Sequence, residues 1–153
     1  SINAELFLNL LARAIDRERM SEAHPAFAHL ITQLSPDEAL ILFHLKQRPF
    51  SFRQHAVYRQ ESSTFGPRTT TQNEFPVNEL VFPGNFGLYM DHLHCLNLAG
   101  IWQDGNQEPI IDSATSRQTG VNIKSVIALE SFGKMFAQSC VPDDLNAQWV
   151  QGA

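Results

Sequence analysis

The second half of the chain carries an order of elements that few folds accommodate. Residues 85–100 are largely apolar with helical spacing, and Gly100 suits the left-handed position beyond a helix end. A strand is expected from Ile101, a polar turn-rich stretch follows, and residues 121–129 alternate as a second strand. Residues 131–140 predict a closing helix. Helix, strand, turn, strand and helix in this order are typical of a winged helix, a scaffold used most often on DNA.

The chemistry of the candidate recognition helix argues against DNA. Residues 86–97 contain no Lys or Arg, and Asp91 lies in their middle. The wing tip offers only Arg117, with Lys124 further along. A specific DNA reader neutralises several phosphates with basic side chains and reads base edges with others. We therefore interpret this helix as a protein-association surface, with the candidate interface residues Phe86, Tyr89, Asp91, His92 and His94.

Two helices are expected at the start of the chain. The first has an apolar stripe at helical spacing, and the second follows Pro25, which suits a first helical turn. The stripe of the first is Phe7, Leu10, Leu11, Ala14 and Ile15, and that of the second is Phe27, Leu30, Ile31 and Leu34.

The strongest helix-start signal in the chain predicts a third helix. Ser35-Pro36-Asp37-Glu38 predicts a capping box, in which Ser35 accepts the N–H of residue 38 and Glu38 reaches back to the Ser35 N–H. Asp37 and Glu38 also suit the positive end of the helix. Residues 39–45 are apolar except for His44, so we expect this helix to be central and buried.

Residues 47–87 differ from the rest because prolines and glycines recur through them. We expect short strand pieces at 50–52 and 57–58, and a flexible loop over the polar stretch 60–74. Residues 75–82 return as a strand that Pro76 weakens. An insertion of this length inside a compact domain is usually functional or disordered.

Length and composition indicate an α+β fold in a single domain of ordinary globular character. The chain has 153 residues, 43% of them hydrophobic and 18% charged, with a net charge of −5. No apolar run is long enough to span a membrane. Because residue 1 is Ser, we expect processing or excision from a longer protein. The predicted parts are a helical layer at 1–46, a proline-rich insertion or loop at 47–87, a winged-helix-like half at 88–140 and a tail at 141–153 with a short turn carrying Leu145 and Trp149.

Basic side chains concentrate in residues 46–68, where only Glu61 opposes them and aromatic residues are interleaved. This mixture is able to hold a single-stranded backbone with stacked bases. A hairpin with its aromatic residues in the core and its arginines in solvent explains it equally well, and a protein-binding surface is a third interpretation. The candidate binding residues are Lys46, Arg48, Arg53, His55, Tyr58, Arg59 and Arg68.

No pattern predicts catalysis, a metal or a cofactor. His92 and His94 are two residues apart on a helix and point in different directions, whereas His92 and Cys95 have usable spacing but no third ligand. No nucleophile elbow or phosphate-binding glycine loop is present. Cys95 and Cys140 lack positive neighbours, and we expect buried free thiols rather than a disulfide. We assign no catalytic residues, no metal ligands and no cofactor.

A set of positions spread along the chain forms a family pattern: His24-Pro25 with Phe27, the box at 34–39, Leu96 with 98–101, Leu129, Phe132-Gly133, Phe136 and Cys140. Together they resemble the bacterial Abi-alpha (abortive infection protein alpha) family over about residues 5–140. The resemblance implies a bacterial cytoplasmic protein with a role in phage defence, and it carries no catalytic residues. One departure is Glu130, where the family pattern has Thr before the closing helix, so we expect Ser131 to cap that helix.

These observations favour a non-catalytic module that binds another protein or its own copy, without membrane contact. The alternative is a nucleic-acid binder that uses the basic segment 46–68. An uncharacterised enzyme or toxin is the third interpretation.

Overall fold

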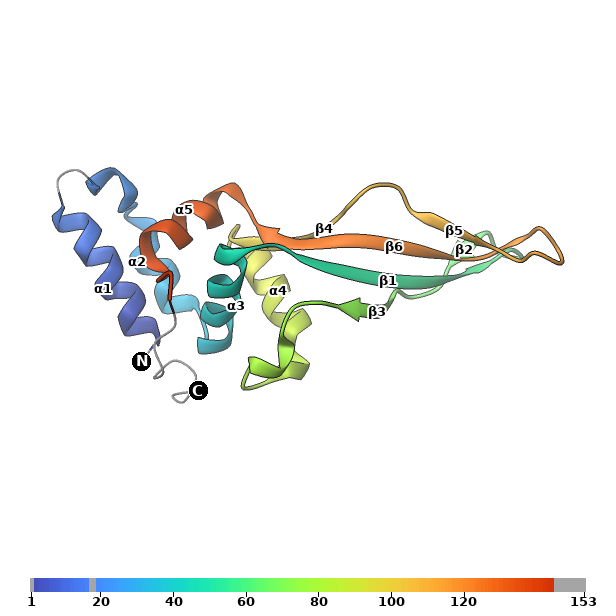
Figure 1. Ribbon diagram of the computed structural model, residues 1–153, viewed down its shortest axis with the longest axis horizontal. Helices are drawn as coiled ribbons and strands as arrows, with labels where there is room; N and C mark the ends of the chain where they lie inside the picture. Colours follow the sequence, from blue (N-terminus) through green and yellow to red (C-terminus); the bar gives the residue numbers. More distant parts are fainter. Residues whose placement is uncertain (1, 17–18, 145–153) are drawn as a thin grey trace. The chain divides into compact units, whose positions relative to one another are not determined.

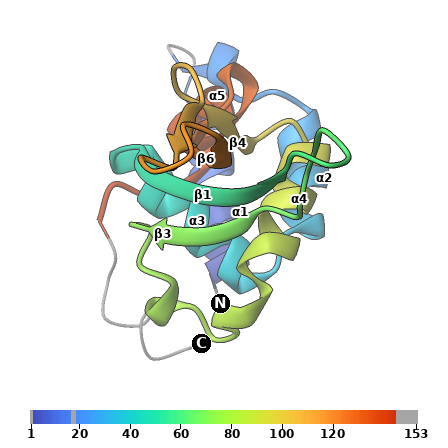
Figure 2. The same ribbon diagram turned by 90° about the vertical axis from the view of Figure 1, so that its right-hand side faces the viewer.

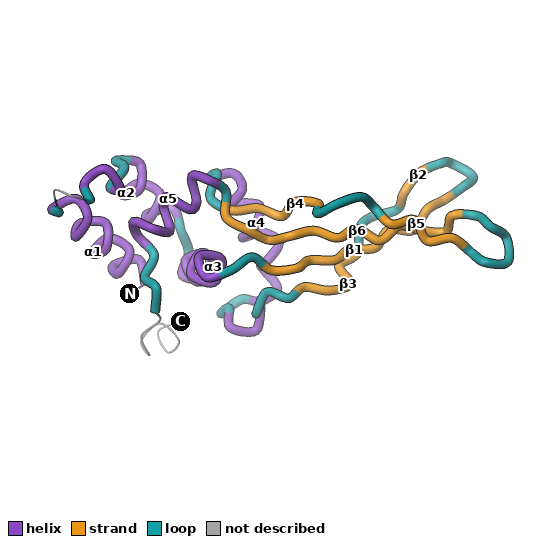
Figure 3. The backbone as a smooth tube through the Cα atoms, turned by 45° about the horizontal axis from the view of Figure 1, so that its top comes forward, coloured by secondary structure: helices purple, strands orange, loops and turns teal. Residues whose placement is uncertain are grey.

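The computed structural model describes residues 2–16 and 19–144, which form two compact units whose segments alternate along the chain. Of the described residues, unit 1 comprises 2–16, 19–49, 76–100 and 128–144, and unit 2 comprises 50–75 and 101–127. Helices lie in unit 1 and most strand residues lie in unit 2 (Figure 3), which confirms the mixed helix and strand composition expected from the sequence. The predicted turn with Leu145 and Trp149 lies outside the described residues.

Figure 1 labels the α-helices and the strands. The helices are α1 (Ile2–Ile15), α2 (Ala26–Gln33), α3 (Pro36–Gln47), α4 (Phe86–Cys95) and α5 (Ser131–Cys140), with short 3-10 turns η1 (Met20–Glu22), η2 (Val77–Glu79) and η3 (Pro83–Asn85). The strands are β1 (Phe50–Arg59), β2 (Thr64–Phe65), β3 (Thr69–Asn73), β4 (Ala99–Gln103), β5 (Glu108–Ile111) and β6 (Gln118–Leu129).

The core of unit 1 is rich in aromatic rings. Phe27 of α2 packs against Phe132 and Phe136 of α5, with ring centroids 5.6 and 5.4 Å apart. The predicted α2 stripe is confirmed, because Phe27, Leu30, Ile31 and Leu34 are all buried. Edge-to-face and tilted pairs of this kind add to the free energy gained by burial.

The predicted buried face of α1 is confirmed only in part. Leu10 is buried as predicted and Phe7 is half-buried, whereas Leu11 is 55% exposed, Ala14 is exposed, and Leu6 outside the predicted stripe is buried. The predicted burial of the Ile15 side chain lies outside what the structure describes. Asn9 fixes the rotation of the helix, because its Nδ2 donates to the Cys140 carbonyl oxygen at 2.9 Å. Leucines at 6, 8, 10 and 11 offer several stripes, so periodicity alone does not choose between them.

The capping box of α3 is confirmed. Glu38 N donates to Ser35 Oγ at 3.2 Å, and Ser35 N donates to Glu38 Oε1 at 3.0 Å. The helix is buried as expected, with Ile41 and Leu42 fully inaccessible. Local sequence chemistry therefore sets the start of the central helix.

Ser35→Ala is expected to lower the free energy of unfolding by about 1 kcal/mol, because the N–H of residue 38 loses its acceptor. Thermal unfolding measures this loss as a fall in Tm of roughly 2–4 °C. Ser113→Ala in the exposed β5–β6 turn is the matched control and should leave Tm unchanged. An equal fall in both variants would contradict the role of the cap.

The end of α4 differs from the prediction. The helix stops at Cys95, and Asn97, not Gly100, takes the left-handed conformation with φ 62. Leu98 N donates to Leu93 O and Asn97 N donates to His94 O, both at 2.9 Å, which is the Schellman pattern. Asn tolerates this conformation, and Gly100 is left to a buried position in β4.

The start of α5 also differs. The helix begins at Ser131 and its N-cap is Glu130, which makes no side-chain capping hydrogen bond. The expected cap by Ser131 is therefore wrong.

Unit 2 is built around the segment that we expected to be an insertion. β1 runs unbroken from Phe50 to Arg59 and pairs antiparallel with β6, from Phe50 opposite Ile127 to Val57 opposite Gly120. β2 and β3 pair with β1, and β4 and β5 pair with β6, so the described residues form a six-stranded sheet. Figure 2 shows β3 lying along β1.

Three expectations about residues 47–87 are therefore wrong. The two short strand pieces are one strand, the flexible loop at 60–74 contains β2 and β3, and the return strand at 75–82 contains the turn η2. The strand after α4 and the one before α5 are present, but they share a sheet with β1. The winged-helix description is not confirmed. The β3 sequence TTTQN is mostly exposed and has no apolar alternation, so only its threonines signalled a strand.

Candidate functional site

A buried carboxylate organises the loop that precedes α4. Asp37 is only 4% exposed, and its carboxylate accepts hydrogen bonds from Val81 N at 2.8 Å, Phe82 N at 3.0 Å and the Tyr89 hydroxyl at 2.9 Å. Burial is the main cause that raises the pKa of Tyr89, so the phenol keeps the proton that it donates. The sequence assigned Asp37 to a helix start and missed this second role.

Glu38 connects the same helix start to α4. Its Oε1 accepts the Ser35 N–H, while its Oε2 lies 2.5 Å from Nδ1 of His92. Glu38 is 4% exposed, and the side chain of His92 is 39% exposed. His92 is thus held against α3 by this contact while part of its side chain stays exposed.

The loop held by Asp37 presents apolar side chains to solvent. Val81 is 43% exposed, Phe82 is 61% exposed and Leu88, in the first turn of α4, is 66% exposed. We call these three residues the apolar surface 81–88. A Cβ at Gly84 in the loop or at Gly87 in α4 would meet no atom within 4 Å apart from its chain neighbours and its own helix, so there is open space at both positions. Large apolar side chains that are exposed on a loop bonded to a buried carboxylate form a candidate binding surface.

The predicted interface residues of α4 do not share one face. Phe86 and Tyr89 are buried in unit 1, so their assignment to an interface is corrected. Asp91 and His94 are exposed as expected, and His94 Nδ1 lies 3.3 Å from Glu130 Oε1. The exposed side of α4 instead adds Leu88 and Cys95. The apolar spacing of Phe86 and Tyr89 with Met90 and Leu93 was the signal for a buried stripe.

The predicted basic segment is divided between the two units. Lys46 and Arg48 belong to unit 1, where Lys46 Nζ lies 2.9 Å from Asp143 Oδ1 and 2.7 Å from the Val141 carbonyl oxygen. The hydrogen bond from Lys46 lowers the pKa of Asp143. Arg48 Nη1 donates to the Pro49 carbonyl oxygen at 3.4 Å.

The other five candidate residues belong to unit 2. Arg53, Arg59 and Arg68 are exposed. The Tyr58 ring packs on Phe65 at 5.0 Å. The imidazole of His55, on β1, reaches Gly120 on β6, because its Nε2 is 2.9 Å from the position that a Cβ would take at Gly120.

The histidines and cysteines form no metal cluster among residues 2–16 and 19–144. Both thiols are free there. Cys140 is buried as expected, but Cys95 is exposed, which corrects the prediction for that residue. Burial raises the pKa of Cys140 from its ordinary value of 9.0 to about 12.

We expect a thiol reagent at about pH 8 to label Cys95 and to leave Cys140 unmodified, because the thiolate is the reactive form. Both should react in denaturant, and mass spectrometry counts the labels. Labelling of Cys140 in the native chain would contradict its burial.

The raised pKa also means that protonated Cys140 stabilises the fold below pH 9.0 and that this contribution is lost as the pH rises toward 12.

The comparisons with known proteins give a family. The chain belongs to the abortive infection alpha (Abi-alpha) family, whose model matches residues 3–140. This confirms the resemblance seen in the sequence and links the chain to abortive infection, a phage defence. Neither the curated proteins nor the solved structures contain a match to this chain. In the part of the chain that is described, no helix has the length and apolarity needed to cross a bilayer.

Proposed function

We propose that this chain is a non-catalytic protein-interaction module of a bacterial cytoplasmic protein in phage defence, and that it binds its partner through the apolar surface 81–88. The partner is another protein, and a second copy of the chain is the first candidate. The observation that carries the proposal is the hold of Asp37 on Val81 and Phe82, which keeps two apolar side chains in solvent on a fixed backbone.

Rigidity favours binding at this surface. Ordering a loop on association costs free energy, and a loop already held by a buried carboxylate avoids most of that cost. An exposed aromatic side chain such as Phe82 is a common anchor of protein interfaces. Leu88 of α4 adds a third large apolar side chain, 66% exposed, to the proposed surface.

The charge on α4 supports a protein partner over a polyanion. Phe86–Cys95 has no Lys or Arg, and its exposed side includes the carboxylate of Asp91. A nucleic-acid surface depends on cations that neutralise phosphates. The predicted use of the whole segment 46–68 for nucleic acid loses support, because Lys46 is paired with Asp143 in unit 1.

The surface is tested with Phe82→Ser combined with Leu88→Ser. The matched control is Leu8→Ser combined with Leu11→Ser, which removes two leucines of α1 that are 59% and 55% exposed. Analytical ultracentrifugation measures self-association, and purification of the chain from phage-infected cells captures other bound proteins. We expect the first pair to weaken association about tenfold or more, as loss of interface anchors usually does, and the control pair to leave it unchanged.

Phage plating on cells that carry each variant connects binding to defence. We expect the first pair to reduce protection and the control to retain it. The proposal is wrong if the purified chain stays monomeric at high concentration and captures no protein. Equal losses in both pairs would remove the assignment to the surface 81–88.

A further inference from the structure

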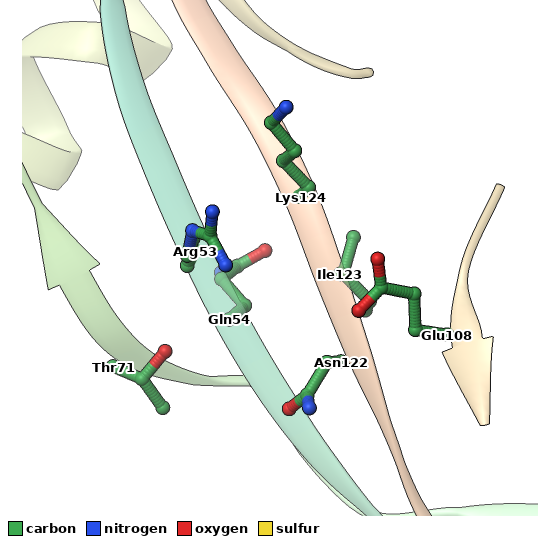
Figure 4. Close-up of a pocket in the computed structure, with 7 residues that line it drawn as sticks. All are labelled: Arg53, Gln54, Thr71, Glu108, Asn122, Ile123 and Lys124. Atoms are coloured by element: carbon green, nitrogen blue, oxygen red, sulfur yellow. The ribbon is translucent and has the colours of Figure 1, made fainter. Parts of the chain in front are cut away.

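Unit 2 has a polar pocket that the proposed function does not use. Its volume is about 230 Å³, and β1, β3, β5 and β6 contribute to its wall (Figure 4). This size suits part of a small ligand rather than a large apolar one. The lining residues are Arg53, Gln54, Thr71, Glu108, Asn122, Ile123 and Lys124.

Two basic residues are cross-strand neighbours at one end of the pocket. Arg53 on β1 is directly opposite Lys124 on β6, and both are exposed. Like charges at opposite positions of an antiparallel pair destabilise the sheet. Lys124 Nζ has Asp104 Oδ2 at 3.6 Å, whereas Arg53 has no carboxylate within ion-pair distance among the described residues. An anion between the two side chains would relieve their repulsion and accept their hydrogen bonds.

The other end of the pocket is different in character. Asn122, two residues from Lys124 on the same face of β6, offers an amide, and Glu108 lies opposite Asn122 on β5. Diagonal neighbours in a sheet lie roughly 7–8 Å apart, so Glu108 and Lys124 are separated by about the span of a sugar–phosphate unit. The carboxylate would repel a second phosphate and accept hydrogen bonds from hydroxyl groups. A carboxylate that accepts a ribose 2′-hydroxyl is a recurring device of nucleotide sites.

We infer that this pocket binds one ribonucleotide unit, with its phosphate between Arg53 and Lys124 and its ribose 2′-hydroxyl at Glu108. The volume accommodates phosphate and sugar and leaves the base outside. Binding is therefore independent of the base and depends on the sugar. The source of the unit is a free nucleotide or a single RNA strand, and both present the same chemistry. This site lies in unit 2 and is independent of the apolar surface 81–88.

Calorimetric titration of the full chain with AMP and dAMP, and anisotropy titration with labelled oligouridylate and oligothymidylate, test the inference. Arg53→Gln and Lys124→Gln should each weaken binding about tenfold or more, as removal of a charged hydrogen bond does. The matched control is Arg117→Gln, which removes an exposed charge from the same unit and should not change the affinity. Glu108→Gln should abolish the preference for ribose over deoxyribose, whereas Glu61→Gln at an exposed turn should retain it. Thermal unfolding checks that each variant is folded.

The outcomes separate clearly. Saturable binding of AMP alone assigns a free nucleotide, and binding of oligouridylate alone assigns an RNA strand, provided that Arg53→Gln weakens either one. Absence of saturable binding to both probes overturns the inference, as does an equal loss in Arg117→Gln. Equal affinity of the wild-type chain for the ribose and deoxyribose forms overturns the role of Glu108 and with it the ribonucleotide assignment.

Discussion

Gly133→Ala is expected to lower the free energy of unfolding more than any other substitution that adds a single methyl group. A Cβ at position 133 would overlap the carbonyl oxygen of Leu98 and lie 2.6 Å from its carbonyl carbon. The same carbonyl accepts the Glu130 N–H at 3.0 Å, so the start of α5 rests directly on the backbone of residue 98. The atoms that the new Cβ would meet belong to the backbone of Leu98, which cannot rotate away as a flexible side chain can. We therefore expect α5 to shift.

We expect a loss of about 3 kcal/mol or more, at the upper end of the cost of overpacking. Thermal unfolding should show this as a fall in Tm of roughly 6–12 °C. Gly87→Ala is the matched control, because that glycine lies in the first turn of α4 and a Cβ there would meet no atom within 4 Å outside its own helix and chain neighbours. It should keep or slightly raise Tm, since Ala is the better helix former. A Gly133→Ala variant as stable as Gly87→Ala would show that α5 does not approach residue 98 so closely.

Asp37→Asn is expected to have the second largest effect, and its effect is local as well as global. The substitution removes the charge from a buried group and turns one of its two acceptors into a donor. At least one of the Val81 and Phe82 N–H groups or the Tyr89 hydroxyl then loses its acceptor. Unsatisfied buried donors cost about 1–3 kcal/mol each. We expect unfolding in urea to show a loss of about 2–4 kcal/mol.

Hydrogen exchange at the amides of Val81 and Phe82 measures how much Asp37→Asn loosens the loop locally. Their exchange should accelerate in Asp37→Asn beyond the change that global stability explains, because the loop is released first. Binding through the apolar surface 81–88 should weaken in parallel. Asp91→Asn, which alters an exposed carboxylate on α4, is the control and should stay within about 0.5 kcal/mol of wild type. Unchanged exchange at Val81 and Phe82 would show that Asp37 does not hold the loop.

Predictions that rested on short-range sequence signals were the most reliable. The capping box at Ser35 and the stripe of α2 are confirmed, since each depends on residues within one or two helical turns. The stripe predicted for α1 is only partly right, because a long-range contact acts on that helix. Asn9 meets the carbonyl of Cys140, a contact 131 positions along the chain, and that contact selects the buried face.

The sheet of unit 2 was harder to predict than the helices. β1 mixes Phe50 and Phe52 with charged and polar residues, and its central position depends on β6, which follows it by more than fifty residues. Such pairings leave little trace in either strand alone. The pocket residues were noticed only in part: Arg53 was a candidate, while Glu108 and Asn122 were not, because register across three strands brings them together.

The chain's own residue order determined its family, the starts of α2 and α3 and the strand that leads into α5, because capping, periodicity and motif spacing act over short distances. Only tertiary structure decided which apolar residues remain in solvent. Val81 and Phe82 look like ordinary core residues in the sequence, and they are held outward by a carboxylate 44 and 45 positions earlier. Burial is a property of the packed whole, since a side chain is removed from water only by neighbours that the fold brings to it.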